Sequence, residues 1–246
     1  MKLNQLFSIK DKVVVITGCS SGIGLELSKG FILNGADVIG ISKSKPSEKI
    51  NFKKFFQCDL NNEKKINDIV NDLKKNKIFI NSLLNVAGVS VAESSSESSL
   101  VRFDKTFNTN VRSMFNLIYK LKPCFSESSS IINFSSIGGI LGFPNNPSYC
   151  ASKGAVISLS RALSNDLGSH KIRVNCIVPG YFHTKMTNLS FQNEKEKKIR
   201  EKRTVLGRWG ELNELLGASI FLASDASSYV TGTELIVDGG WSSKGL

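Results

Sequence analysis

Short apolar runs alternate along the whole chain with segments whose apolar residues recur three or four positions apart. This alternation predicts parallel strands joined by right-handed helical crossovers, with helices on both faces of one sheet. The expected strands are 13–17, 37–41, 54–57, 79–85, 130–135, 172–178 and 234–237. The expected helices are 22–34, 62–75, 100–121, 149–167 and 212–223.

These elements predict one α/β domain over residues 1–246, with a doubly wound parallel sheet of about seven strands. The sequence contains no internal repeat and no linker. The serine clusters Ser94–Ser99 and Ser126–Ser130 are interpreted as loops. The link between the second and third strands contains Pro46 and is too short for a full helix.

A glycine-rich turn follows the first expected strand and opens the first helix. Its sequence is Thr17-Gly18-Cys19-Ser20-Ser21-Gly22-Ile23-Gly24. Glycines allow a tight turn and a close approach to a pyrophosphate, while the helix N-terminus offers unpaired N–H groups and the positive end of its dipole. Alone, such a turn also fits a purely structural role. At the first strand–helix junction it predicts a dinucleotide site in a Rossmann-type sheet.

The turn has the spacing Gly18-xxx-Gly22-x-Gly24, which resembles that of the short-chain dehydrogenase/reductase family. Further motifs of that family follow in order over almost the whole chain. They are Asp59-Leu60, Asn85-Val86-Ala87-Gly88, Asn108-Thr109-Asn110-Val111, Ser136 with Tyr149-xxx-Lys153, Pro179-Gly180 with Thr184, and Val237-Asp238-Gly239-Gly240. Val86 stands where the family has a second asparagine.

The resemblance implies an NAD(P)-dependent oxidoreductase that transfers a hydride between the nicotinamide and a carbonyl or secondary alcohol. It also implies a set of cofactor contacts. These are Gly18, Ser20, Ser21, Gly22, Ile23, Gly24, Ser42, Lys43, Asp59, Leu60, Asn85, Ala87, Gly88, Tyr149, Lys153, Pro179, Gly180, Phe182 and Thr184.

Tyr149 and Lys153 are four positions apart on an expected helix, so their side chains share a face. A tyrosine has a pKa of about 10, and a nearby ammonium together with an oxidised nicotinamide would favour the phenolate. Tyr149 is therefore the candidate general acid/base, and Ser136 would polarise the substrate oxygen. The resemblance adds that Lys153 holds the nicotinamide ribose and that Asn110 positions a water for proton exchange. Because Tyr149 would supply the acid/base group and Ser136 would polarise the substrate, no metal ion is expected.

The end of the second strand bears on the choice between NAD and NADP. NAD-selective sites place a carboxylate there, but this chain has Ser42 followed by Lys43 and Lys45, and Asp37 lies at the wrong end. A serine beside a cation suits a 2′-phosphate, so NADP is preferred over NAD. The alternative is that both lysines are simply exposed loop residues.

Substrate choice is assigned to residues 181–208, which are expected to form a lid over the strand ends. The stretch Arg203–Gly210 and the ending Asp238–Trp241 resemble gluconate 5-dehydrogenase-like and 2-deoxy-gluconate 3-dehydrogenase-like members. This resemblance implies a sugar acid, sugar or polyol substrate. The alternative is a 3-oxoacyl carrier-protein reductase, although the expected loop Phe125–Ser130 carries serines and Glu127 rather than cations for an acidic carrier. A non-catalytic cofactor-binding sensor is a remote alternative, since Ser136, Tyr149, Lys153 and Asn110 are all present.

The formal net charge of +11 raises the question of nucleic acid binding. The lysines are dispersed and interleaved with glutamates, as in 194–203, so neither a nucleic acid partner nor a membrane is expected. The surplus charge would favour encounter with an anionic cofactor or substrate. No apolar run could span a bilayer and no signal peptide is present, which predicts a cytoplasmic protein.

Five scattered cysteines without a CxxC pair are interpreted as reduced thiols. His170 is expected at the surface, and His183 beside the substrate has no assigned role. The helix from Tyr149 carries small residues, which allow close helix contact. In relatives this helix and the preceding one form a subunit interface, which implies a homotetramer, with a dimer as the alternative.

Overall fold

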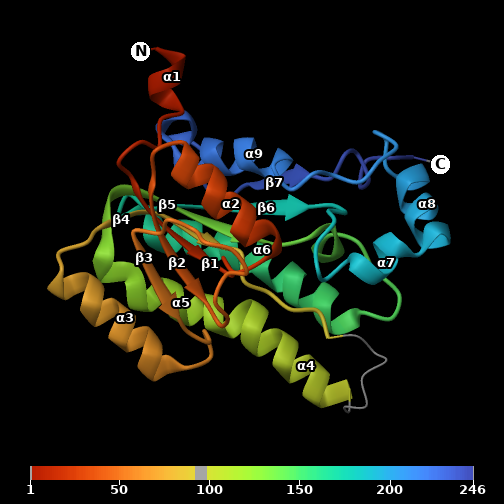
Figure 1. Ribbon diagram of the computed structural model, residues 1–246, viewed down its shortest axis with the longest axis horizontal. Helices are drawn as coiled ribbons and strands as arrows, with labels where there is room; N and C mark the ends of the chain where they lie inside the picture. The colour runs from red at the N-terminus through yellow and green to blue at the C-terminus, as the bar shows by residue number, and fades with distance from the viewer. Residues whose placement is uncertain (1, 92–98, 246) are drawn as a thin grey trace.

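A seven-stranded sheet forms the centre of the computed structural model, which describes residues 2–91 and 99–245. The strand order is β3-β2-β1-β4-β5-β6-β7, and every neighbouring pair is parallel. Helices cover both faces of the sheet (Figure 1). The expected doubly wound α/β fold is confirmed.

The strands are β1 (Val13–Thr17), β2 (Asp37–Ser42), β3 (Lys54–Gln57), β4 (Ile80–Asn85), β5 (Phe125–Phe134), β6 (Arg173–Pro179) and β7 (Glu234–Val237). The α-helices are α1 (Leu3–Leu6), α2 (Gly22–Leu33), α3 (Glu63–Lys75), α4 (Ser99–Phe107), α5 (Ser113–Leu121), α6 (Pro147–Gly168), α7 (Asn188–Gln192), α8 (Glu194–Arg203) and α9 (Glu214–Ala223). Short helical turns lie at Asn108–Arg112, Lys122–Cys124, Ile137–Gly139 and Asp225–Ser227.

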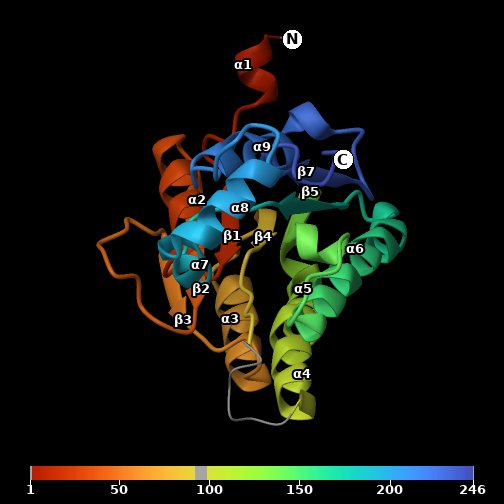
Figure 2. The ribbon, with the colours of Figure 1, turned by 90° about the vertical axis from the view of Figure 1, so that its right-hand side faces the viewer.

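Two apolar layers hold the helices against the sheet. Helices α3, α5 and α6 pack on one face, and α2 and α9 pack on the other (Figure 2). The pattern of α3 shows why: Ile66, Ile69, Val70 and Leu73 are buried along one stripe. Asn62 begins this helix by accepting a hydrogen bond from the backbone N–H of Lys65 at 3.1 Å.

The interpretation of Ser126–Ser130 as a loop is wrong, because β5 begins at Phe125. Ser129 and Ser130 are fully buried. Their hydroxyls donate to the carbonyls of Ile80 at 3.0 Å and Leu222 at 2.7 Å, which satisfies the polar atoms inside the sheet. In the other cluster, Ser99 begins α4, and residues 94–98 lie outside the described residues.

The expected helix 100–121 is interrupted by a π turn at Asn108–Arg112. Asn110, in this turn, is buried. Its amide accepts from the backbone N–H of Val89 at 2.8 Å and donates to the carbonyl of Val89 at 2.9 Å. It also donates to Ser152 Oγ at 3.0 Å, so the irregular turn joins the segment after β4 to α6.

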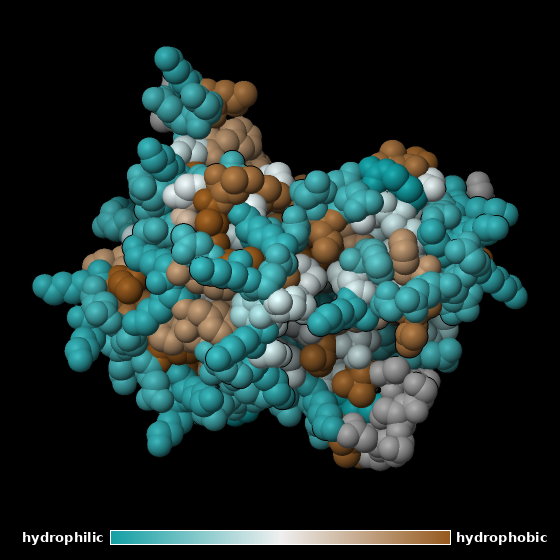
Figure 3. All heavy atoms as spheres, viewed as in Figure 1, coloured by the Kyte–Doolittle hydropathy of each residue, from teal (hydrophilic) through white to brown (hydrophobic). Residues whose placement is uncertain are grey.

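The link between β2 and β3 agrees with expectation. Residues 43–53, between β2 and β3, contain no helix. Helices α7 and α8 lie within 181–208, on the side toward which β6 points (Figures 1 and 2). Hydrophilic side chains cover much of the face in Figure 3. None of the helices in the described ranges is long and apolar enough to cross a membrane. All five cysteines are free thiols, and His170 is exposed.

Candidate active site and cofactor cleft

A cleft of about 470 Å³ runs along the carboxyl ends of the central strands. The strand order reverses between β1 and β4, and ligands of doubly wound sheets bind at such a reversal. Most of the predicted cofactor contacts line this cleft. They are Gly18, Ser20, Ser21, Gly22, Ile23, Gly24, Ser42, Lys43, Asp59, Leu60, Ala87, Gly88, Tyr149, Lys153, Pro179 and Thr184.

Three predicted cofactor contacts do not line the cleft. Asn85 is buried, and its amide donates to Asn133 Oδ1 at 2.9 Å. Phe182 is buried in the core under α2 and α9. Gly180 packs against Asp238, whose Cα would lie 2.7 Å from a Cβ at that position.

Sequence reasoning missed another group of lining residues. They are Ile41, Ser44, Cys58, Asn61, Val86, Val89, Thr109, Phe134, Ser135, Lys185 and Met186. Most of them adjoin a recognised motif at a strand end, so the motif neighbours could have been included. Thr109 reaches the cleft from the π turn, for which the sequence carries no local signal.

The glycine-rich turn is held closely against the turn that follows β4. Gly18 has φ +68°, and a Cβ there would lie 2.9 Å from Ala87 Cα. Thr17 Oγ1 accepts hydrogen bonds from the backbone N–H groups of Val86 at 3.0 Å and Ala87 at 3.1 Å. Ser21 begins α2 without a side-chain capping bond, so the first N–H groups of that helix remain available to an anion.

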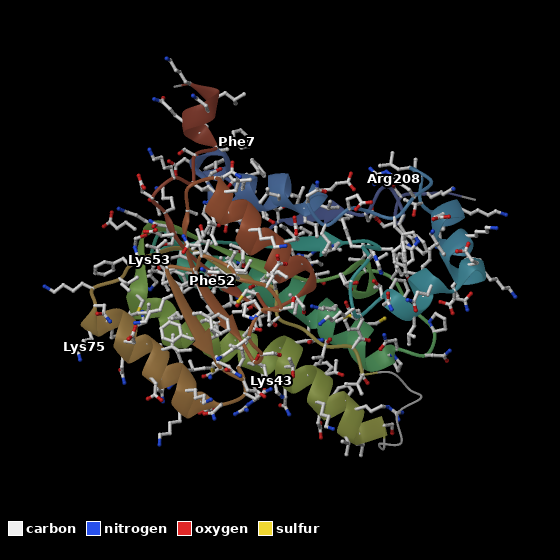
Figure 4. All side chains as sticks on the ribbon, viewed as in Figure 1. Phe7, Lys43, Phe52, Lys53, Lys75 and Arg208 are labelled. Carbon is white, nitrogen blue, oxygen red and sulfur yellow. The ribbon has the colours of Figure 1, made fainter. Side chains whose placement is uncertain are left out.

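The end of β2 presents hydroxyls and one cation to the same cleft. The Ser42 hydroxyl donates to Ser20 Oγ at 2.9 Å. Lys43 lies just beyond β2 (Figure 4), and its Nζ is 3.0 Å from Asp59 Oδ2. The backbone N–H of Asn61 and then Lys43 hold the pKa of the Asp59 carboxyl below its ordinary value. These residues fit a phosphorylated ribose, although Asp59 offsets part of the charge of Lys43.

Tyr149 lines the cleft near the end of β5, and Ser136, which is not among the lining residues, lies beside it. Burial raises the pKa of the Tyr149 phenol above its ordinary value, and a side-chain hydrogen bond with Ser136 acts in the opposite direction. The Ser136 Oγ also accepts from the backbone N–H of Gly138 at 3.1 Å, which fixes its position at the strand end. Burial prevails, so the phenol of the protein alone is protonated at neutral pH, the form required of a general acid.

Lys153 lies under this pair. Its Nζ is 5.8 Å from the centre of the Tyr149 ring and donates to the Phe134 carbonyl at 2.8 Å. A Cβ on Gly88 would lie 3.2 Å from this Nζ and 3.3 Å from Asn110 Oδ1, so both predicted groups converge on one point. Burial lowers the pKa of the Lys153 ammonium to about 8.

The lowered pKa of Lys153 predicts a pH-dependent stability. The unfolded chain binds the proton more tightly than the folded chain, so the free energy of unfolding rises as pH increases from about 8 to about 10. The penalty is fully present below pH 8 and amounts to at most about 3 kcal/mol. Urea unfolding of wild type and Lys153→Met across this window should show wild type gaining stability relative to the variant. A difference that is independent of pH would contradict the prediction.

The family described as enoyl-(acyl carrier protein) reductase matches residues 18–242. A 2-dehydro-3-deoxy-D-gluconate 5-dehydrogenase from Escherichia coli is 34% identical over 245 residues, covering 96% of this chain and 97% of that protein. A 3-oxoacyl-[acyl-carrier-protein] reductase from Chlamydia trachomatis is also 34% identical, over 242 residues, covering 94% of this chain and 97% of that protein.

Solved structures are similar over the same length. The crystal structure of a gluconate 5-dehydrogenase from Burkholderia cenocepacia, in complex with NADP and tartrate, has a TM-score of 0.89 at 27% identity. The match covers 99% of this chain and 100% of that one. These similarities confirm the expected family and reaction class. The chain belongs to the short-chain dehydrogenase/reductase family and is an NAD(P)-dependent oxidoreductase that acts on CH–OH groups.

Proposed function

We propose that this enzyme interconverts a hydroxyl and a carbonyl group of a sugar acid, with NADP as its preferred cofactor. The observation that carries the proposal is the presence of Tyr149 and Lys153 together in the cleft, with Ser136 beside Tyr149. The sugar-acid class is supported by relatives named 2-dehydro-3-deoxy-D-gluconate 5-dehydrogenase and gluconate 5-dehydrogenase.

The chain's own groups divide the work of proton transfer and orientation. The Tyr149 oxygen takes the proton of the substrate hydroxyl during oxidation and returns it during reduction. The Ser136 hydroxyl hydrogen-bonds the same substrate oxygen and orients it. Lys153 would hold the nicotinamide ribose, and Asn110 would support proton exchange beside it. When bound, the nicotinamide accepts or supplies the hydride and, in its oxidised form, adds a positive charge that favours the phenolate.

Turnover of sugar acids tests the proposal. The absorbance of the reduced nicotinamide would be followed with both cofactors, in both directions, on aldonates, neutral sugars and polyols, and 3-oxoacyl thioesters. Activity on an aldonate and its 2-oxo or 5-oxo derivatives supports the proposed substrate class. Activity confined to thioesters would reject it.

Reduction of a 3-oxoacyl thioester is the second candidate, because a 3-oxoacyl-[acyl-carrier-protein] reductase is as similar in sequence as the sugar-acid enzymes. The serines of 126–130 no longer argue against carrier docking, since they belong to β5 and not to a loop. Binding of an acidic carrier would weaken steeply with salt, whereas binding of a small sugar acid would weaken less. Turnover of any of these substrates would exclude the non-catalytic sensor.

The NADP preference is tested at the end of β2. We expect Lys43→Gln to raise the KM for NADPH about 5-fold and to leave that for NADH within about 2-fold, because one exposed charge pair contributes up to about 1 kcal/mol. Lys45→Gln removes the same charge from the same loop without touching the cleft and is the matched control. Steady-state kinetics with both cofactors measures the effect. Equal losses with NADPH and NADH would refute a contact with the 2′-phosphate.

A homotetramer remains the proposed assembly, and the surface of α4 and α5 supports it. Leu100, Phe103, Phe115 and Tyr119 are each at least 40% exposed on these helices. We expect Phe115→Asp to shift the protein toward dimers or monomers in light scattering, because a charge would be buried at the interface. Phe79→Asp, at an exposed phenylalanine before β4, is the control. A Phe115→Asp variant with unchanged mass would contradict this interface. The cytoplasmic location stays a prediction.

A further inference from the structure

Tyr181 lies near Tyr149 of the catalytic pair. Its ring centre is 6.1 Å from that of Phe143, and the Phe143 ring would lie 3.3 Å from a Cβ on Gly138. Gly138 in turn donates its N–H to Ser136 Oγ. The phenol of Tyr181 is also close enough to raise the pKa of Tyr149 by charge repulsion. A substrate oriented by Ser136 would therefore approach the Tyr181 region with its remaining atoms.

Arg200 of α8 lies over the ring of Tyr181. Its guanidinium carbon is 4.9 Å from the ring centre, and its side chain is only 19% exposed. Glu196, one turn earlier, accepts a hydrogen bond from Nη1 at 2.9 Å. The contact with the ring and the contact with Glu196 fix the plane of the guanidinium. A cation is thus held in a set orientation within the segment predicted to cover the substrate.

Unpaired donors gather around the same tyrosine. Among the described residues, the buried side-chain polar atoms without a hydrogen-bond partner include Arg200 Nε, Trp209 Nε1 and Trp241 Nε1. The Trp209 and Trp241 rings lie 5.3 Å and 4.7 Å from that of Tyr181, and both tryptophans are only 6% exposed. Buried donors are normally paired, and leaving one unpaired costs free energy. Oxygen acceptors of a ligand would satisfy these three N–H groups.

We propose that Arg200 binds the carboxylate of the substrate through the Nε edge of its guanidinium, which makes it the residue that selects sugar acids over neutral sugars. Carboxylates pair with two adjacent N–H groups of an arginine, and Glu196 occupies only Nη1. The inference rests on the proposed function, since it assigns the charge recognition of that same substrate. Polyhydroxy chains also supply acceptors for the two indole N–H groups, which the alkyl part of an acyl thioester does not.

Binding of carboxylate probes tests the proposal without requiring turnover. Titration calorimetry would measure tartrate, and gluconate in the presence of NADPH, where neither partner can transfer a hydride to the other. We expect Arg200→Gln to weaken both carboxylates about 10- to 100-fold, as for loss of a charged hydrogen-bonded pair. Arg200→Lys should recover part of this loss, because it restores the charge without the paired N–H groups. The affinity for NADPH should not change.

Two further variants separate recognition from a structural role. Lys198→Gln removes the same charge from an exposed position of α8 and should change carboxylate binding less than about 2-fold. Glu196→Gln keeps an oxygen acceptor for Nη1, and thus the orientation of the guanidinium, but removes the competing negative charge, so it should tighten tartrate binding. If Arg200 serves only to clamp α8 onto Tyr181, Glu196→Gln should weaken binding instead. If Lys198→Gln and Arg200→Gln lose the same carboxylate affinity, the effect comes from the net charge of the protein, and the proposal is overturned.

The outcomes also distinguish this inference from the proposed function. If wild type and Arg200→Gln bind both carboxylates with equal affinity, the role of Arg200 is wrong, but the proposed function is not affected. Wild type that binds neither carboxylate and turns over only 3-oxoacyl thioesters would reject the substrate class, and the role of Arg200 with it. A larger loss in Arg203→Gln than in Arg200→Gln would contradict the assignment as well, because Arg203 lies over the Trp241 ring but is exposed.

Discussion

Tyr149→Phe should lower kcat on the native substrate by about 10²- to 10⁴-fold, which is the usual contribution of a positioned acid/base group. The variant keeps the ring and loses only the oxygen that exchanges the proton. Because phenylalanine has the same ring, it fits the space beside Lys153, whose Nζ lies 5.8 Å from the ring centre. The loss should therefore appear in kcat, while the Kd for NADPH changes less than about 2-fold.

Tyr229→Phe removes the same hydroxyl from a fully exposed position and is the matched control. Steady-state rates and NADPH titrations on both variants and wild type give the comparison. Activity of Tyr149→Phe within about 3-fold of wild type would remove Tyr149 from the reaction. A large loss of NADPH affinity would instead place the defect in cofactor binding, and the acid/base role would then lose its support.

Local patterns were sufficient to predict the frame of this site. The glycine-rich turn, the strand ends and the Tyr149–Lys153 spacing depend on residues close together in sequence, and the expected elements carry them to the same cleft. The order of motifs predicted the family, and the family match over residues 18–242 agrees with that prediction. The alternation of strands and helices also predicted a parallel sheet, because each helix returns the chain to the same edge of the sheet.

Contacts between distant segments could not be predicted in this way. The π turn at Asn110 depends on Val89 and Ser152, which lie 21 and 42 positions away. The burial of Ser130 within β5 depends on a carbonyl 92 positions away that accepts its hydroxyl. Neither partner is visible in a local pattern, so the helix was predicted as continuous and the serines as a loop.

The pKa values at the site show the same division between local and distant causes. The sequence places an ammonium one turn from Tyr149, which favours the phenolate. The fold instead buries both groups, so burial raises the pKa of Tyr149 and lowers that of Lys153 to about 8. Residue type and spacing predict the direction in which one charged group shifts the pKa of its neighbour. The effect of desolvation on that pKa depends on all the residues packed around the group.

Gly24→Ala should reduce NADPH affinity at least about 10-fold and lower the free energy of unfolding by about 1–3 kcal/mol, as overpacking does in a filled site. A Cβ at Gly24 would lie 2.4 Å from the Gly18 carbonyl oxygen and 2.8 Å from its carbonyl carbon. Both atoms are backbone, so the turn itself must move. The same turn presents the first N–H groups of α2 to the cleft, and its displacement should therefore weaken the predicted binding of the cofactor phosphates as well as the fold.

Gly217→Ala makes the same chemical change where the structure leaves room. Gly217 lies within α9, and a Cβ there has no neighbour within 4 Å. Alanine favours a helix over glycine by about 1 kcal/mol, so this variant should be more stable than wild type with unchanged NADPH affinity. Alanine is also favoured over glycine at position 24, which lies in the first turn of α2. The measured loss of unfolding free energy in Gly24→Ala is therefore smaller than the cost of the clash itself. Urea unfolding and NADPH titration of both variants measure the two effects. If Gly24→Ala is as stable as Gly217→Ala and binds NADPH as tightly, the contact of Gly24 with Gly18 does not constrain the first turn.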